Sequence, residues 1–245
     1  MTVASLAMYP FTHVRSDWDR LWQNVRMRLS FDAPLLDWDL PADVACRSDD
    51  LLLGQTCGWP LVTDLATRVR VVGTFDWTVD GAVDGTYCSL LVSNRDQPLT
   101  DIVQRPGLRV AANSADSLSG WISLLSVANA HRVPLDNVEW TGAHVLSLVA
   151  LRERRADLAA IDSVSWSHLD RGGLSVVGRG PRIPCLPLVT AGSSSDAVVD
   201  ELRRALAGAV SDPTMIETCA SLRIRRFLDR DLADYEGILA LAQVG

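Results

Sequence analysis

Small polar residues stand directly before an apolar run at two places within residues 113–147. Ser117-Leu118-Ser119-Gly120 precedes the run from Trp121 to Ala130, and Thr141-Gly142-Ala143-His144 precedes the run from Val145 to Leu151. This pattern predicts two helix starts, whose unpaired N–H groups carry about half a positive charge. Two such starts, with hydroxyls and one imidazole, would bind a small anion. The alternative is that Ser and Thr act only as helix caps.

The amino-acid composition argues against some classes of binding partner and of chemistry. The 245 residues are 48% hydrophobic and 22% charged, with a net charge of −7 and no basic block, which argues against nucleic acid as a partner. All 23 basic residues are arginine. Because lysine is absent, neither Schiff-base chemistry nor a P-loop is available.

Other catalytic and metal-binding patterns are also missing. The five cysteines are widely spaced without a CxxC pair, so we expect free thiols, no zinc site and no cofactor. The chain has no GxSxG, HExxH or P-loop motif. Cys57 and one of the four histidines would be needed for a catalytic dyad, but no spacing supports one.

Short apolar strands alternate with amphipathic segments along the chain, which predicts an α/β fold with mainly parallel sheet. The expected strands are residues 3–8, 50–54, 69–75, 85–94, 109–112, 157–161, 174–177 and 186–190. The expected helices begin near Ser16, Leu61, Trp121, Gly142 and Asp196, and a last helix spans residues 231–242. Residues 37–48 are expected to be irregular, and residues 224–228 form either a strand or a helical turn.

The N-terminal residues carry no basic region and no long apolar run, so they are expected to form a strand rather than a signal peptide. No stretch approaches the 18 apolar residues that a membrane span requires. As the sequence is written, we expect a cytoplasmic protein without membrane insertion. A periplasmic location would follow if an upstream export segment is missing.

Six segments, in this order and spacing, resemble the phosphate/phosphonate-type substrate-binding proteins of ABC transporters. They are Met8-Tyr9-Pro10 and residues 50–61, 85–92, 117–120, 141–144 and 157–166. The resemblance implies the two-lobed type II periplasmic binding protein fold, with two strand crossovers and a ligand cleft between the lobes. It places lobe one at residues 1–88 plus 188–245 and lobe two at residues 89–187.

The resemblance also implies a set of ligand-binding residues in lobe two. Ser117 and Ser119 match a Ser-Thr-Ser turn of the family, in which Leu118 replaces the central hydroxyl. His144 matches a Gly-Ser-His position, and Asp162 matches an acidic strand end where an amine on the ligand could be held.

Other candidates are expected from lobe one and the crossover. Tyr9 and Tyr87 match cleft-lining positions of the family, although core packing explains Tyr87 equally well. Gln55, Thr56 and Trp59 follow a strand end, which is where open α/β sheets bind ligands.

The carboxylate of Asp162 is expected at the carboxyl end of a buried strand. Burying it unpaired would be costly, so we expect it either to meet the ligand and water or to pair with an arginine.

Three functions follow from these observations. The first is a monomeric solute-binding protein for a small oxoanion-bearing molecule, with an ABC permease as its partner. The second is a cytoplasmic enzyme on the same fold, similar to those of the futalosine route to menaquinone. The third is a ligand-sensing module. The absence of catalytic motifs favours binding over catalysis.

Overall fold

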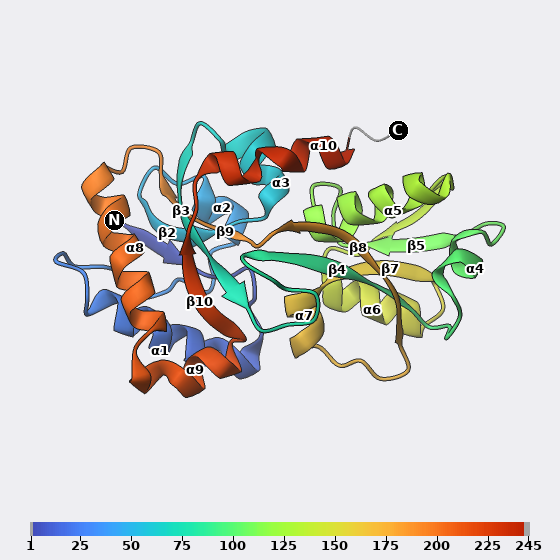
Figure 1. The fold of residues 1–245 in the computed structure, drawn as a ribbon, viewed down its shortest axis with the longest axis horizontal. Helices are drawn as coiled ribbons and strands as arrows, with labels where there is room; N and C mark the ends of the chain where they lie inside the picture. The colour runs from blue at the N-terminus through green and yellow to red at the C-terminus, as the bar shows by residue number, and fades with distance from the viewer. Residues whose placement is uncertain (1, 243–245) are drawn as a thin grey trace. The chain divides into compact units, whose positions relative to one another are not determined.

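The computed structural model describes residues 2–242. The chain forms two compact units. Unit 1 comprises the chain up to Thr78, Ala82–Thr86 and Pro184–Glu236, and unit 2 comprises Val79–Gly81, Tyr87–Ile183 and the segment from Gly237 onward. Each unit contains one five-stranded sheet (Figure 1).

The sheet of unit 1 has the order β1-β2-β9-β3-β10. Its strands are β1 (Val3–Ser5), β2 (Leu51–Gln55), β9 (Pro187–Ala191), β3 (Val69–Trp77) and β10 (Ile224–Asp229). Among the described residues of this unit, β1 and β2 pair in parallel, and the other three strand pairs are antiparallel. The predicted mainly parallel sheet is therefore wrong for this unit. Strands buried on both faces read as continuous apolar runs, which do not reveal their direction.

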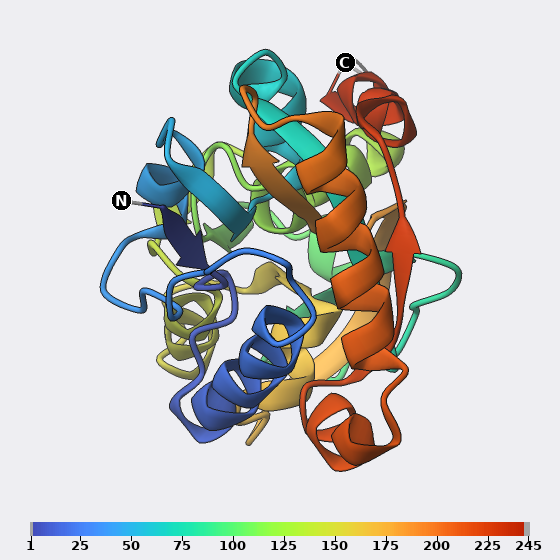
Figure 2. The ribbon, with the colours of Figure 1, turned by 90° about the vertical axis from the view of Figure 1, so that its left-hand side faces the viewer.

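Helices cover this sheet because each has one apolar stripe. The helices are α1 (Arg15–Arg26), α2 (Ala42–Cys46), α3 (Gly58–Pro60) with a π-helical turn (Leu61–Leu65), α8 (Asp196–Val210) and α9 (Ile216–Ser221). Helix α1 packs on α8 and α9, α8 packs on β3 and β10, and α2 packs on β1 and β2 (Figure 2). Short 3-10 segments lie at Thr12–Val14 and Pro213–Met215, and a longer one, Leu232–Ile238, begins in unit 1 and ends in unit 2.

Helix α1 shows how the sequence determines this packing. Trp18, Leu21, Trp22 and Val25 recur at helical spacing and are buried. The Trp18 ring lies 5.9 Å from that of Phe75 on β3, so an aromatic cluster joins the helix to the sheet.

The sheet of unit 2 has the order β6-β5-β7-β4-β8. Its strands are β6 (Asn137–Trp140), β5 (Arg109–Ala112), β7 (Leu158–Asp162), β4 (Thr86–Ser93) and β8 (Ser175–Pro184). Strands β6, β5 and β7 run parallel, and β4 is antiparallel to β7. The prediction of parallel strands thus holds for the three strands whose ends carry the site described below.

Six helical segments lie in the part of unit 2 that the structure describes, which ends at residue 242. They are α4 (Leu99–Val103), a π-helical turn (Leu118–Ile122) continuing into α5 (Ser123–His131), α6 (His144–Arg152), α7 (Ser163–His168) and α10 (Leu239–Ala242). Within residues 2–242, no helix is long and apolar enough to cross a membrane.

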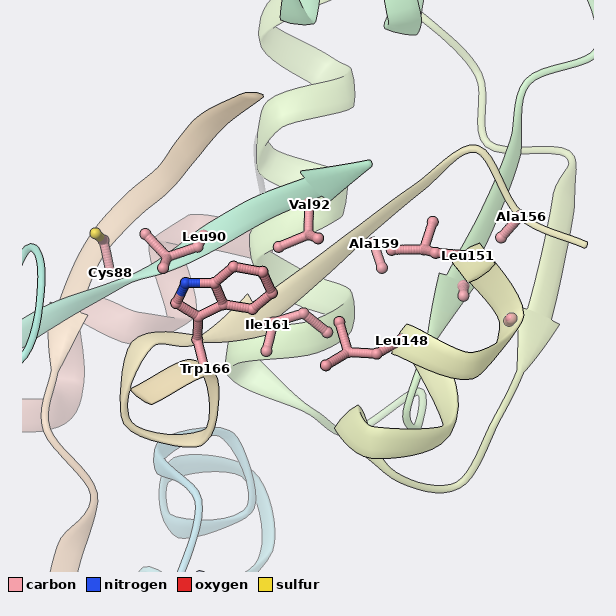
Figure 3. Packing of buried hydrophobic residues seen from close by; sticks show 11 residues of the cluster. Cys88, Leu90, Val92, Leu148, Leu151, Ala156, Ala159, Ile161 and Trp166 are labelled. Atoms are coloured by element: carbon pink, nitrogen blue, oxygen red, sulfur yellow. The ribbon is translucent and has the colours of Figure 1, made fainter. Parts of the chain in front are cut away.

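Alternation along the strands builds a separate apolar layer on each face of the unit 2 sheet. Leu90 and Val92 of β4 pack with Ile161 of β7, Leu148 of α6 and Trp166 of α7 (Figure 3). The intervening strand residues face the other layer, where Leu91, Val110 and Leu158 pack with Ile102 of α4 and with Leu124 and Val127 of α5. The sheet is therefore covered on both sides, and its polar groups gather at the strand ends.

Candidate anion-binding site

The candidate site lies at one edge of the unit 2 sheet. Because β6, β5 and β7 are parallel, their carboxyl ends meet at the same edge. Asn113 follows β5, Thr141 follows β6 and Asp162 ends β7. The two helix starts predicted from the sequence follow the first two of these strands.

Ser117 caps the first helix start, as predicted. Its Oγ accepts a hydrogen bond from the Gly120 backbone N–H at 3.0 Å. A Cβ at Gly120 would collide with the Asn113 side-chain oxygen, which explains why glycine stands there. Leu118 is 2% exposed and buries its side chain in the core, while its carbonyl oxygen accepts the Ser123 hydroxyl.

The second helix, α6, begins at His144 rather than at Gly142. Gly142 has a φ of 83°, a left-handed conformation that favours glycine, and its N–H donates to the Asn113 carbonyl oxygen at 2.9 Å. The cap residue Ala143 makes no side-chain cap. Thr141 does not cap the helix either, because its hydroxyl lies 2.7 Å from the Ser147 hydroxyl and 3.2 Å from the Ala112 carbonyl oxygen.

His144, at the start of α6, contacts the start of the first helix through Ser119. Its Nε2 lies 3.1 Å from the Ser119 Oγ and 3.3 Å from the Asp162 Oδ2. Burial lowers the pKa of the imidazole below its ordinary value, while the Asp162 carboxylate opposes that shift. The Nδ1 of the ring is buried without a hydrogen-bond partner among the described residues.

Asp162 has two separate roles. Its Oδ1 accepts the Ser165 N–H at 2.8 Å and so caps α7, while its Oδ2 faces His144. The side chain is only 4% exposed. The sequence left open whether this carboxylate pairs with an arginine, and in the structure its side-chain partner is His144 instead.

The structure thus brings Ser117, Leu118, Ser119, His144 and Asp162 into one region of unit 2. Tyr87, on β4 of the same unit, is buried. The other predicted residues belong to unit 1, which the structure describes separately.

In unit 1, Tyr9 is buried with its ring edge-on to Trp77 at 5.5 Å, which is a packing contact. Gln55 is fully buried at the end of β2, and neither side-chain amide atom has a hydrogen-bond partner among the described residues. Thr56 is buried next to it, and its N–H donates to the Pro187 carbonyl oxygen. Trp59 is partly exposed.

Sequence reasoning missed Asn113. Its carbonyl oxygen fixes the second helix start, and its side-chain oxygen is buried beside Gly120 without a hydrogen-bond partner among the described residues. Its position directly after a predicted strand was the signal that could have identified it. Ser163, whose buried hydroxyl is also unpartnered in the described structure, follows Asp162 in the same way.

Within residues 2–242, no three or more His, Cys, Asp or Glu side chains converge as metal ligands would. The cysteines are separate thiols, and burial raises the pKa of Cys46 to about 12.

Comparison with known proteins assigns most of the chain to one family. Residues 55–235 match the family model described as ABC transporter, phosphonate, periplasmic substrate-binding protein. No curated protein sequence matches the chain.

Solved structures share the fold at low sequence identity. A binding protein component of an ABC phosphonate transporter from Pseudomonas aeruginosa is 18% identical, with a TM-score of 0.74 over 98% of this chain and 84% of that one. PhnD1 from Prochlorococcus marinus, in complex with methylphosphonate, is 16% identical, with a TM-score of 0.69 over 94% and 93%. XAC2383 from Xanthomonas citri, bound to ATP, is 16% identical, with a TM-score of 0.70 over 100% and 96%.

Proposed function

Because the chain belongs to the periplasmic substrate-binding proteins of phosphonate ABC transporters, we propose that it binds a small solute carrying a phosphonate-like oxoanion. The observation that carries the proposal is the convergence of Ser119 and Asp162 on one nitrogen of His144, at 3.1 and 3.3 Å. These side chains lie at two helix starts and at the carboxyl ends of parallel strands, where anions bind favourably.

The hydroxyls supply donors for the oxoanion. The Ser117 Oγ accepts the Gly120 N–H, so its own hydrogen remains available for donation. The Ser119 hydroxyl is positioned by His144 and offers a second donor. The N–H groups of a helix's first turn lack intrahelical partners and add donors that no side-chain substitution removes.

The same geometry argues against the enzyme alternative. In a Ser-His-Asp relay, the acid holds one imidazole nitrogen while the other nitrogen faces the nucleophile. Here Ser119 and Asp162 both contact Nε2, and Nδ1 has no hydrogen-bond partner among the described residues. This arrangement positions donors and acceptors around a ligand but does not activate the Ser119 hydroxyl through that relay.

The cellular role follows from family membership as part of the proposal. We propose that the protein works in the periplasm as a monomer and presents its ligand to an ABC permease. The lobe boundaries at 1–88 plus 188–245 and 89–187, with ligand bound between the lobes, stay a prediction. So does ligand contact by Tyr9, Gln55, Thr56, Trp59 and Tyr87.

Calorimetric titration with methylphosphonate tests the site. Ser119→Ala removes one donor to a charged group, which is worth roughly 1.5–3 kcal/mol, so the Kd should rise about 10- to 150-fold. Ser195→Ala is the matched control, since Ser195 caps α8 in unit 1 and lies outside the site. A folded Ser119→Ala variant that binds like wild type would show that the anion binds elsewhere.

A further inference from the structure

A cavity of about 420 Å³ lies in unit 2, at the edge of the sheet opposite to the anion-binding site. Its lining comes from the two segments that lead from α4 into β5 and from α5 into β6. Because β5 and β6 are parallel, these segments meet at the amino ends of the strands. The volume is in the range of small-molecule sites, about 300–1,000 Å³.

The floor of the cavity is apolar. Val103 and Leu108 line it and are 2% and 5% exposed, and both belong to the core layer between the sheet, α4 and α5. Val133 also lines the cavity and packs against the same layer. An apolar group bound here would lose contact with water against core side chains, which is favourable.

Two arginines give the cavity a positive rim. Arg105 comes from the segment before β5 and Arg132 from the segment before β6, and both side chains are exposed. Neither guanidinium has an ion-pair or hydrogen-bond partner among the described residues, whereas the Arg109 guanidinium is held by Asp157 at 3.0 Å. Asp136 also lines the cavity, so the two arginines leave a net charge of +1 there, in a chain whose net charge is −7.

The main chain places Arg132 at this rim. Arg132 is the C-cap of α5, and its N–H donates to the carbonyl oxygens of Ala128 and Asn129. Its φ is 56°, a left-handed conformation that helix ends usually give to glycine. The cap uses only backbone atoms, so the Arg132 side chain stays available to a ligand.

From this arrangement we propose that the cavity binds a small organic acid, whose apolar body covers the floor and whose carboxylate pairs with Arg105 and Arg132. Guanidinium groups suit this role because their planar N–H donors match the two oxygens of a carboxylate. The site is separate from the anion-binding site, since Ser119 and His144 lie at the carboxyl ends of the strands. The proposal therefore does not depend on the proposed function.

Two probe ligands test the need for charge by calorimetric titration. Phenylpropanoate and phenylpropanamide have nearly the same shape, but only the first is negatively charged at neutral pH. One exposed ion pair changes affinity about two- to fivefold, so wild type should bind the acid about 4- to 25-fold more tightly than the amide.

The double variant Arg105→Gln with Arg132→Asn removes both charges. Both side chains are exposed, and asparagine tolerates the left-handed backbone at residue 132, so the fold should persist, as circular dichroism would verify. The double variant should bind the acid about 4- to 25-fold more weakly and should no longer distinguish it from the amide. Its binding of methylphosphonate should equal that of wild type.

Arg154→Asn is the matched control. Arg154 follows α6, has a φ of 58° and an exposed side chain without a partner among the described residues, but does not line the cavity. This variant should bind the acid like wild type, and a loss equal to that of the double variant would mean that only the overall charge matters, against the proposal.

Three other results would overturn the proposal. One is equal binding of acid and amide by wild type, and another is no detectable binding of the acid at millimolar concentration. The third is a folded double variant that still prefers the acid, which would mean that the acid binds elsewhere. None of these results bears on methylphosphonate binding, so the proposed function would stand or fall by its own titration.

Discussion

Replacing Gly120 with alanine tests whether the first helix start is held as the structure shows. A Cβ at this position would overlap the Asn113 side-chain oxygen and approach the Ser117 Oγ to 3.0 Å. Overpacking costs about 1–3 kcal/mol, and disturbing the Ser117 cap adds about 1 kcal/mol. Gly120→Ala should therefore lower the free energy of unfolding by about 2–4 kcal/mol, measured by urea denaturation.

A second substitution identifies the source of this loss. Asn113→Ala removes the colliding side chain, so the double variant Gly120→Ala with Asn113→Ala should regain about 1–3 kcal/mol relative to Gly120→Ala alone. The two residues are in contact, so their effects should be strongly non-additive. Gly237→Ala is a matched control, because a Cβ there meets nothing within 4 Å and should change stability by less than about 0.5 kcal/mol.

Two results would refute this reasoning. One is a Gly120→Ala variant as stable as wild type. The other is a double variant whose loss equals the sum of the two single losses, because additivity would mean that Asn113 and residue 120 do not meet. Methylphosphonate titration of the double variant would also show whether the repaired helix start still binds the anion.

Three further predictions concern titratable groups. Burial raises the pKa of Asp157, but hydrogen bonds from Arg109 outweigh it and hold that pKa below its ordinary value. The stability this pair provides is present above about pH 4 and is lost as pH falls, so Asp157→Asn should flatten the acid side of the urea-unfolding profile. Burial lowers the pKa of His144, so the unfolded chain takes up a proton first, and stability should decrease as pH falls below about 6.5. His144→Gln should lose that slope, and an unchanged slope would contradict the assignment. Burial raises the pKa of Cys46 to about 12, so a thiol reagent should label the partly exposed Cys57 before Cys46 in the native protein. Mass spectrometry would follow the order of labelling, and labelling of Cys46 before Cys57 would count against this packing.

Elements with strong local signals were predictable. The helix α8 was expected from Asp196 to Val210 and has those bounds, because Ser195 caps it and its apolar stripe is regular. Strand β5 was expected at Arg109–Ala112 and is found there. In both cases a short window of sequence contains the information that determines the element.

Elements with weak local signals were missed. Strand β6 (Asn137–Trp140) lies at the sheet edge, is only partly buried and has no apolar alternation. Helix α2 (Ala42–Cys46) was expected to be irregular, because five residues are too few for helical periodicity to show.

The helix starts of the site were predictable, whereas their contacts were not. The Ser117 cap follows from residue type and position. The meeting of Ser119, His144 and Asp162 depends on the strand order β6-β5-β7, which places three distant segments side by side. No local pattern specifies that order, so the sequence left the partner of Asp162 open.

Backbone bonds fix the second helix start more than side chains do. The Asn113 carbonyl oxygen holds the Gly142 N–H at 2.9 Å, and the Ala112 carbonyl oxygen holds the Thr141 N–H at the same distance, so the second helix start is tied to the end of β5 by main-chain contacts. The side chain at Ala143 can therefore lack a capping hydroxyl without moving this start.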